Sequence, residues 1–171
     1  LDGVEGITEA DYQVIGNAYP DVLLSLQNTF SYKQWSLSFL LRSSIGNDVL
    51  NQSRVYYEGF GYFGTRNILR STLDHANYKD GAYYSSRFVE DGSYLKVKNI
   101  TLSYDITSPK LKRINITRIQ PYISLQNFIT WTGYSGYDPE VSQSESATQM
   151  GIDWGTYPNV RTVVVGLNLT F

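Results

Sequence analysis

Few residues of this sequence have the types and spacing that catalysis requires. Asp138 and Glu140 stand two residues apart in GYDPE, and a pair of carboxylates can hydrolyse a glycosidic bond. Because Pro139 lies between them, a turn in which they cap backbone groups explains them more simply. The single His75 lies in a polar stretch, and the sequence contains no Cys. We therefore expect no catalytic residues, no cofactor and no enzymatic activity.

The first residues, LDGVEGIT, have a partial likeness to a calcium-binding loop. Such a loop needs oxygen ligands at its first and twelfth positions and Gly at its sixth. With Gly6 in the sixth place, Glu5 suits the fifth, but the first and twelfth are Leu1 and Tyr12. The stretch therefore predicts a turn, and we expect no metal site.

Aromatic side chains offer the best means of binding. The sequence has 15 Tyr, 7 Phe and 3 Trp, many of them in two long stretches, 46–92 and 132–158. Aromatic faces stack on sugar rings and bury area at low entropic cost. They can also contact a partner protein, or pack the loops against each other. The candidates for contact with a substrate or partner are Tyr56, Tyr57, Tyr62, Tyr83, Tyr84, Tyr134, Tyr137 and Trp154.

Five stretches in which apolar and polar residues alternate would carry these loops. Alternation with a period of two is the pattern of β-strands that have one apolar face. The five predicted strands are 21–32, 34–44, 99–106, 118–131 and 161–171.

Three irregularities are expected around these strands. Leu95 and Val97 are out of phase with Ile100 and Leu102, which predicts a bulge or a part of the strand that rises above a membrane. Pro121 lacks a backbone donor and predicts a bulge or a displaced pairing. A short helix is expected over 48–58, at the start of the first long loop.

The connections between the predicted strands alternate in length. The turns at 32–34 and 107–116 are short, whereas 46–92 and 132–158 are long. Outer-membrane barrels alternate in this way, with short periplasmic turns and long extracellular loops, and long structureless loops are uncommon in compact soluble domains. The expected fold class is all-β, an antiparallel transmembrane β-barrel segment of about five long strands. The alternative is a soluble β-rich carbohydrate-binding module.

Composition narrows the classes of partner. The net charge is −2 and no basic cluster occurs, which argues against a nucleic acid partner. No run of 18 apolar residues is present, so no transmembrane helix is expected. Trp35 and Tyr104 would lie near one membrane interface and Trp131 near the other, as anchors.

Four stretches of the sequence resemble the C-terminal part of SusC/RagA-family TonB-linked outer-membrane transporters. They are VIGNAYPDVLLSLQNTFSYKQWSLSFLL (14–41), VEDGSYLKVKNITLSYDI (89–106), SLQNFITWTGYSGYDPEV (124–141) and GIDWGTYPNVRTVVVGLNLTF (151–171). The resemblance implies that residues 1–171 are the C-terminal segment of a barrel of about 22 strands. The plug domain would lie outside this chain.

The same resemblance implies a function in the bacterial outer membrane. Members of this family import glycans or oligopeptides with energy from TonB, which would act through regions absent from this chain. A SusD-like surface lipoprotein caps the barrel. The expected contacts are therefore this lipoprotein, the substrate, outer-membrane lipid and the remainder of the same barrel.

The last residues fit the C-terminal signal that the barrel-insertion machinery reads in such proteins. This signal is an aromatic residue at the end, preceded by apolar residues at alternating positions. The matching residues are Val163, Val165, Leu167, Leu169 and Phe171. We expect Phe171 to be a true end and Leu1 to be a cut within a longer chain.

Overall fold

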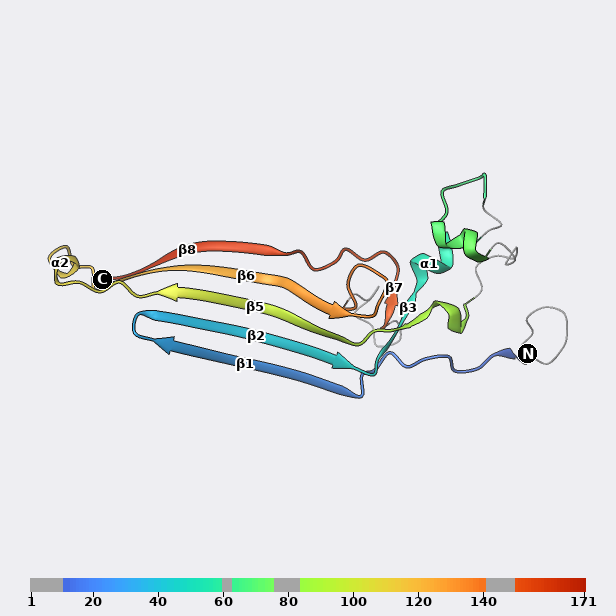
Figure 1. Ribbon diagram of the computed structural model, residues 1–171, viewed down its shortest axis with the longest axis horizontal. Helices are drawn as coiled ribbons and strands as arrows, with labels where there is room; N and C mark the ends of the chain where they lie inside the picture. Colours follow the sequence, from blue (N-terminus) through green and yellow to red (C-terminus); the bar gives the residue numbers. More distant parts are fainter. Residues whose placement is uncertain (1–10, 60–62, 76–83, 141–149) are drawn as a thin grey trace.

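Five long strands form one open antiparallel sheet in the computed structural model, which describes residues 11–59, 63–75, 84–140 and 150–171. In the order in which they pair, the strands are β1 (Val22–Tyr32), β2 (Trp35–Ile45), β5 (Tyr94–Tyr104), β6 (Arg118–Thr132) and β8 (Thr162–Thr170). They lie side by side along the long axis of the molecule (Figure 1). The five antiparallel strands predicted from alternation are confirmed.

Strand pairing gathers the apolar residues on one face of this sheet. Phe39 of β2 pairs with Ile100, Ile100 with Leu125, and Leu125 with Val163 of β8. Paired residues share a face, so this row crosses four strands on one side. The row stays accessible, and its neighbour Val165 is 76% exposed. The opposite face is rich in Ser, Thr, Asn and Gln.

A bulge at Lys98 explains the change of phase along β5. Asn99 and Val97 lie opposite the consecutive residues Leu40 and Leu41, so Lys98 is the extra residue. The register against β6 shifts at the same place. Apolar residues before and after the bulge therefore keep to one face, as one of the two explanations drawn from the sequence predicted.

The bulge or displaced pairing expected at Pro121 is absent, and this prediction is wrong. Pro121 pairs with Leu167 of β8 without a shift in register. On its other side, the pairing with β5 ends at Tyr122 and resumes in an isolated bridge between Ile119 and Ile106. Because proline has no N–H to donate, the ladder is interrupted here while its register is kept.

A second sheet lies at the end of the long sheet where the long connections emerge (Figure 1). Its central strand β3 (Asp48–Asn51) pairs antiparallel with β4 (Val89–Asp91) and parallel with β7 (Ile152–Asp153). The short helices of this region are α1 (Gln52–Tyr57) and the 3-10 helices η3 (Arg70–His75) and η4 (Ser86–Phe88).

The helix expected over 48–58 begins later than predicted. Residues 48–51 form β3 instead, because Val49 and Asn51 alternate inward and are both buried. Asn51 then starts α1, since its Oδ1 accepts a hydrogen bond from the Arg54 N–H at 3.1 Å. This is the usual role of an N-cap Asn. Val55 of the helix is buried, so the chain's small apolar core lies at this end.

The opposite end of the long sheet carries the short connections. Lys33 takes a φ of 54° in the turn between β1 and β2. The basic connection contains α2 (Pro109–Lys112), which the sequence analysis did not predict. The rings of Trp35 and Tyr104 lie 4.7 Å apart at this end. Trp131, which pairs with Leu95, lies at the other end, so the predicted separation of these aromatics is confirmed.

Gly166 provides a test of packing on the polar face. It pairs with Tyr122, and a Cβ added at Gly166 would lie 2.4 Å from the Tyr122 ring. We expect Gly166→Ala to lower the free energy of unfolding of the intact protein by about 1–3 kcal/mol through overpacking. Thermal unfolding measures this. Gly133→Ala is the matched control, since a Cβ there meets nothing within 4 Å. Equal stability of the two variants would contradict the prediction.

Candidate functional site

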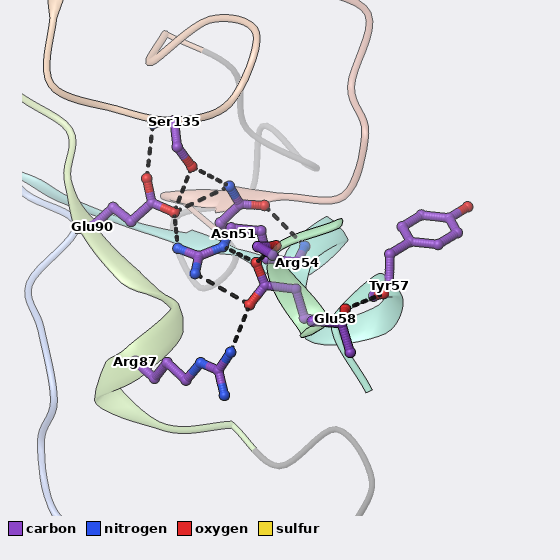
Figure 2. Close-up of polar contacts among 9 residues, drawn as sticks. Asn51, Arg54, Tyr57, Glu58, Arg87, Glu90 and Ser135 are labelled. Atoms are coloured by element: carbon purple, nitrogen blue, oxygen red, sulfur yellow. Dashed lines mark hydrogen bonds and ion pairs between the residues drawn. The ribbon is translucent and has the colours of Figure 1, made fainter. Parts of the chain in front are cut away.

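An ionic cluster holds the segments at the loop end of the molecule together (Figure 2). Arg54 of α1 donates from Nε to Glu58 at 2.8 Å and from Nη1 to Glu90 of β4 at 2.7 Å. Arg87 of η4 donates to the same Glu58 at 3.1 Å. The Glu58 side chain is only 2% exposed. We call Arg54, Glu58, Arg87 and Glu90 the Arg54 cluster.

The loop that follows β6 is attached to the Arg54 cluster through Ser135 (Figure 2). The backbone N–H and the hydroxyl of Ser135 both donate to Glu90, each at 2.8 Å. The amide of Asn51 donates to Ser135 at 3.4 Å and to Glu90 at 3.3 Å. Three segments that lie far apart in the sequence are thus joined by one set of polar contacts.

The carboxylates of the Arg54 cluster stay ionised despite their burial. Burial alone would raise the pKa of Glu58, but hydrogen bonds from Arg54 and Ser71 outweigh it and hold this pKa below its usual range. The pKa of Glu90 is likewise lowered, since contacts with Arg54 and Ser135 overcome its burial. These groups are therefore matched partners in a structural network.

A second ionic cluster lies on the polar face, near the loop end of β5. Lys96 is 1% exposed, and its Nζ donates to Asp138 at 2.7 Å and to Glu140 at 2.6 Å. Lys98 donates to Glu140 at 2.8 Å. Arg42 of β2 lies 3.9 Å from Glu140. We call these five residues the Lys96 cluster.

The Lys96 cluster fastens the loop after β6 to the sheet. Asp138 accepts hydrogen bonds from the backbone N–H of Glu140 and from both the backbone and the side chain of Asn159. The turn-capping role predicted for Asp138 is therefore confirmed. The sequence analysis did not predict that Asp138 also pairs with Lys96. Burial by itself would raise the pKa of Asp138, but the hydrogen bond from Lys96 prevails and the pKa is lowered.

Three of the predicted loop aromatics form one exposed group. The ring of Tyr56 packs edge-on against Tyr57 at 5.0 Å and against Trp154 at 5.4 Å. The Arg66 guanidinium lies 3.8 Å from the Tyr56 ring centroid. Each of the three aromatic side chains is a little over 40% exposed. These rings therefore pack against each other and still present accessible surface. We call Tyr56, Tyr57 and Trp154 the Tyr56 group.

None of the other predicted loop aromatics that the structure describes is in ring contact with the Tyr56 group. Tyr134 is 5% exposed and donates its hydroxyl to Asp153 at 2.7 Å. Tyr84 accepts a hydrogen bond from Gln52 at 2.8 Å and is exposed. Tyr137 is 87% exposed. Tyr62 and Tyr83, like the turn predicted at the N-terminus, lie outside the described residues.

The predicted C-terminal signal residues run along β8, away from these loops. They belong to β8 and the residue after it, and the C-terminus lies at the turn end of the long sheet (Figure 1). Val163, Val165, Leu167 and Leu169 pair with residues of β6 and point to the apolar face. Phe171 is 79% exposed.

The loop end presents paired charges and exposed aromatic rings. Across the described residues, no three His, Cys, Asp or Glu side chains gather where they could hold a metal ion. None of the helices described is long and apolar enough to cross a membrane. The charged groups that the sequence analysis missed are paired with each other. The sequence did offer one signal of these charge pairs. Lys96 is charged and stands at a polar-face position of β5, where the other such positions carry mostly Ser, Thr and Asn.

Lys96 provides a direct test of the clamp on the loop after β6. Lys96→Met in the intact protein leaves the buried Asp138 without its cation, so we expect the free energy of unfolding to fall by about 3–5 kcal/mol. Hydrogen exchange in 133–140 and 150–161 should also rise. Lys98→Met is the matched control, because Glu140 keeps Lys96 and Tyr94 as partners. Unchanged exchange in both variants would show that the contacts do not hold the loop.

Comparison with known proteins finds relatives among TonB-dependent receptors. No family model matches the chain. A TonB-dependent receptor of Formosa agariphila is 31% identical over 183 residues, which cover 100% of this chain and 18% of that protein. The TonB-dependent receptor SusC of Bacteroides thetaiotaomicron is 30% identical over 172 residues, covering 96% of this chain and 16% of SusC. The chain thus spans less than a fifth of these curated relatives.

Solved structures with the same fold carry the name RagAB. The structure of the RagAB peptide transporter aligns with a TM-score of 0.75 and 24% identity, over 90% of this chain and 17% of that chain. The RagAB peptide importer in the open-open state aligns with a TM-score of 0.77 and 22% identity, over 99% of this chain and 20% of that chain. The sequence matches thus identify this chain as a relative of SusC-type TonB-dependent receptors, which are proteins of the bacterial outer membrane, and the RagAB structures share its fold.

Proposed function

We propose that residues 1–171 are the C-terminal barrel segment of an outer-membrane importer energised by TonB. The importer takes up glycans or oligopeptides and works with a SusD-like surface lipoprotein. The plug domain and the segment that contacts TonB belong to regions outside this chain. Support comes from relatives that match nearly the whole of the chain.

The observation that carries this proposal is the exposed apolar face of the long sheet. Leu37, Leu102, Ile123 and Val165 pair in register across four strands, and each is at least 37% exposed. In water, so large an apolar surface would drive association. Against lipid it is stabilising, and the polar opposite face then lines the lumen.

The free edges of the long sheet support continuation into a larger barrel. The sheet ends at β1 on one side and at β8 on the other. Backbone groups at such edges must be paired inside the hydrocarbon, which a closed barrel achieves. The remainder of the same barrel therefore supplies the strands that pair with β1 and β8.

The loop end is the proposed extracellular side. The Tyr56 group, Tyr84 and Tyr137 supply accessible aromatic surface there, suited to a capping lipoprotein or a substrate. Tyr134 contributes by packing, since it is buried against Asp153. Tyr62 and Tyr83 remain candidates from the sequence alone. Short turns at the opposite end would face the periplasm.

Membrane fractionation of the intact protein tests the proposal. We expect recovery in the outer-membrane fraction and extraction only with detergent, because the apolar face needs lipid or detergent as cover. Recovery as a detergent-free soluble monomer would instead support a carbohydrate-binding module. Uptake of labelled oligosaccharides and oligopeptides, with and without a working TonB, separates import from ligand binding without transport.

Phe171 tests the role proposed for the C-terminal signal. Deleting Phe171 should lower the amount of folded protein in the outer membrane severalfold, because the insertion machinery loses the terminal aromatic residue. Surface labelling measures this amount. Phe171→Tyr keeps an aromatic ring and is the matched control. If the deletion and the control reach the surface equally, Phe171 has no such role.

A further inference from the structure

A cavity of about 570 Å³ opens on the polar face beside the Lys96 cluster. Its walls come from the segment before β1, the loop ends of β1, β2 and β5, the start of β3, and the segment between β6 and β8. Leu23, Val49 and Met150 supply apolar surface. The charged residues that line it are Arg42, Lys98 and Glu140. Two cations thus face one carboxylate.

Both oxygens of the Glu140 carboxylate in this cavity already accept hydrogen bonds. Glu140 accepts from Lys96 at 2.6 Å, from Lys98 at 2.8 Å and from the Tyr94 hydroxyl at 2.8 Å. Hydrogen bonds from these groups outweigh its burial and hold the pKa of Glu140 below its usual range. The positive charge of Arg42 is therefore not needed to keep Glu140 ionised.

Arg42 is the group in the cavity with donors to spare. Within the described part of the chain, its one ionic contact is with Glu140 at 3.9 Å, which is longer than a hydrogen bond. Its side chain is 47% exposed. A guanidinium presents a planar fork of N–H donors that matches the two oxygens of a carboxylate.

We infer that this cavity binds a carboxylate group of the imported substrate, with Arg42 as its bidentate partner and Lys98 as a second cation. The inference rests on the proposed import function and adds a substrate class to it. The carboxylate belongs to an acidic oligopeptide or to a uronic acid oligosaccharide, and the chemistry at Arg42 is the same for both. The apolar walls accommodate the neighbouring part of the substrate.

Binding by the purified full-length protein in detergent tests this assignment. The acidic probes are an end-blocked tetraglutamate and a trigalacturonate, and their neutral counterparts are a tetraglutamine and a galactose trimer. We expect one acidic probe to bind at least about tenfold more tightly than its neutral counterpart, since a charge-assisted pair is lost in the latter. The acidic probe that binds identifies the source of the carboxylate.

Variants at Arg42 identify the group responsible. Arg42→Gln should lose at least about tenfold in affinity for the acidic probe and leave the neutral probe unaffected. Arg42→Lys should fall between, since it keeps the charge without the fork. Lys33→Gln removes an equal charge in the turn at the far end of the sheet and should bind as the unaltered protein does. Thermal unfolding of each variant checks that the fold is kept.

The inference is overturned if acidic and neutral probes bind alike, if no probe binds, or if Arg42→Gln leaves the acidic probe's affinity unchanged. The import function is judged separately, from outer-membrane location and TonB-dependent uptake. A protein that passes those tests without charge-selective binding rejects the role of the cavity alone.

Discussion

Everything in this molecule depends on keeping the side chains of five strands sorted between two faces while the backbone ladder stays paired. A slip of one residue would move a whole row to the wrong face. The bulge at Lys98 prevents this along β5, because it absorbs one residue between two runs of opposite phase. It keeps Leu95 on the apolar face and Lys96 on the polar face. The Lys96 cluster therefore exists as a consequence of strand register.

Charge pairing does at the loop end what apolar packing does in an ordinary core. The small core of the described residues lies there, and it includes the charged side chains of Glu58, Lys96 and Asp138. Lys96 and Glu58 are almost fully removed from water, where an unpaired charge would be very costly. Each has at least two partners of opposite charge. Because these partners come from separate loops, their pairing fixes how the loops meet and leaves the Tyr56 group and the cavity beside Arg42 accessible.

Local patterns in the sequence predicted much of the fold. Alternation predicted all five long strands, and connection length predicted their antiparallel order. The bulge or displaced pairing predicted at Pro121 was wrong, because the loss of one hydrogen-bond donor interrupts a ladder without moving its register. The start of α1 was misplaced, since the residues of β3 alternate too briefly to be recognised without the partners that bury Val49. Asp138 was correctly expected to cap a turn, but its pairing with Lys96 spans 42 residues and leaves no local pattern.

The sequence by itself determined which residues lie on the apolar face of the sheet and which lie on the polar face, because a period of two along a strand is a local property. It also carried the resemblance to SusC/RagA proteins, since that resemblance lies in contiguous stretches. The tertiary structure alone decided which charges meet, because partners such as Arg54 and Glu90 become neighbours only through strand pairing and loop return. It also left Arg42 with unused donors at a cavity, since the number of partners around a guanidinium is known only when every neighbouring segment is in place.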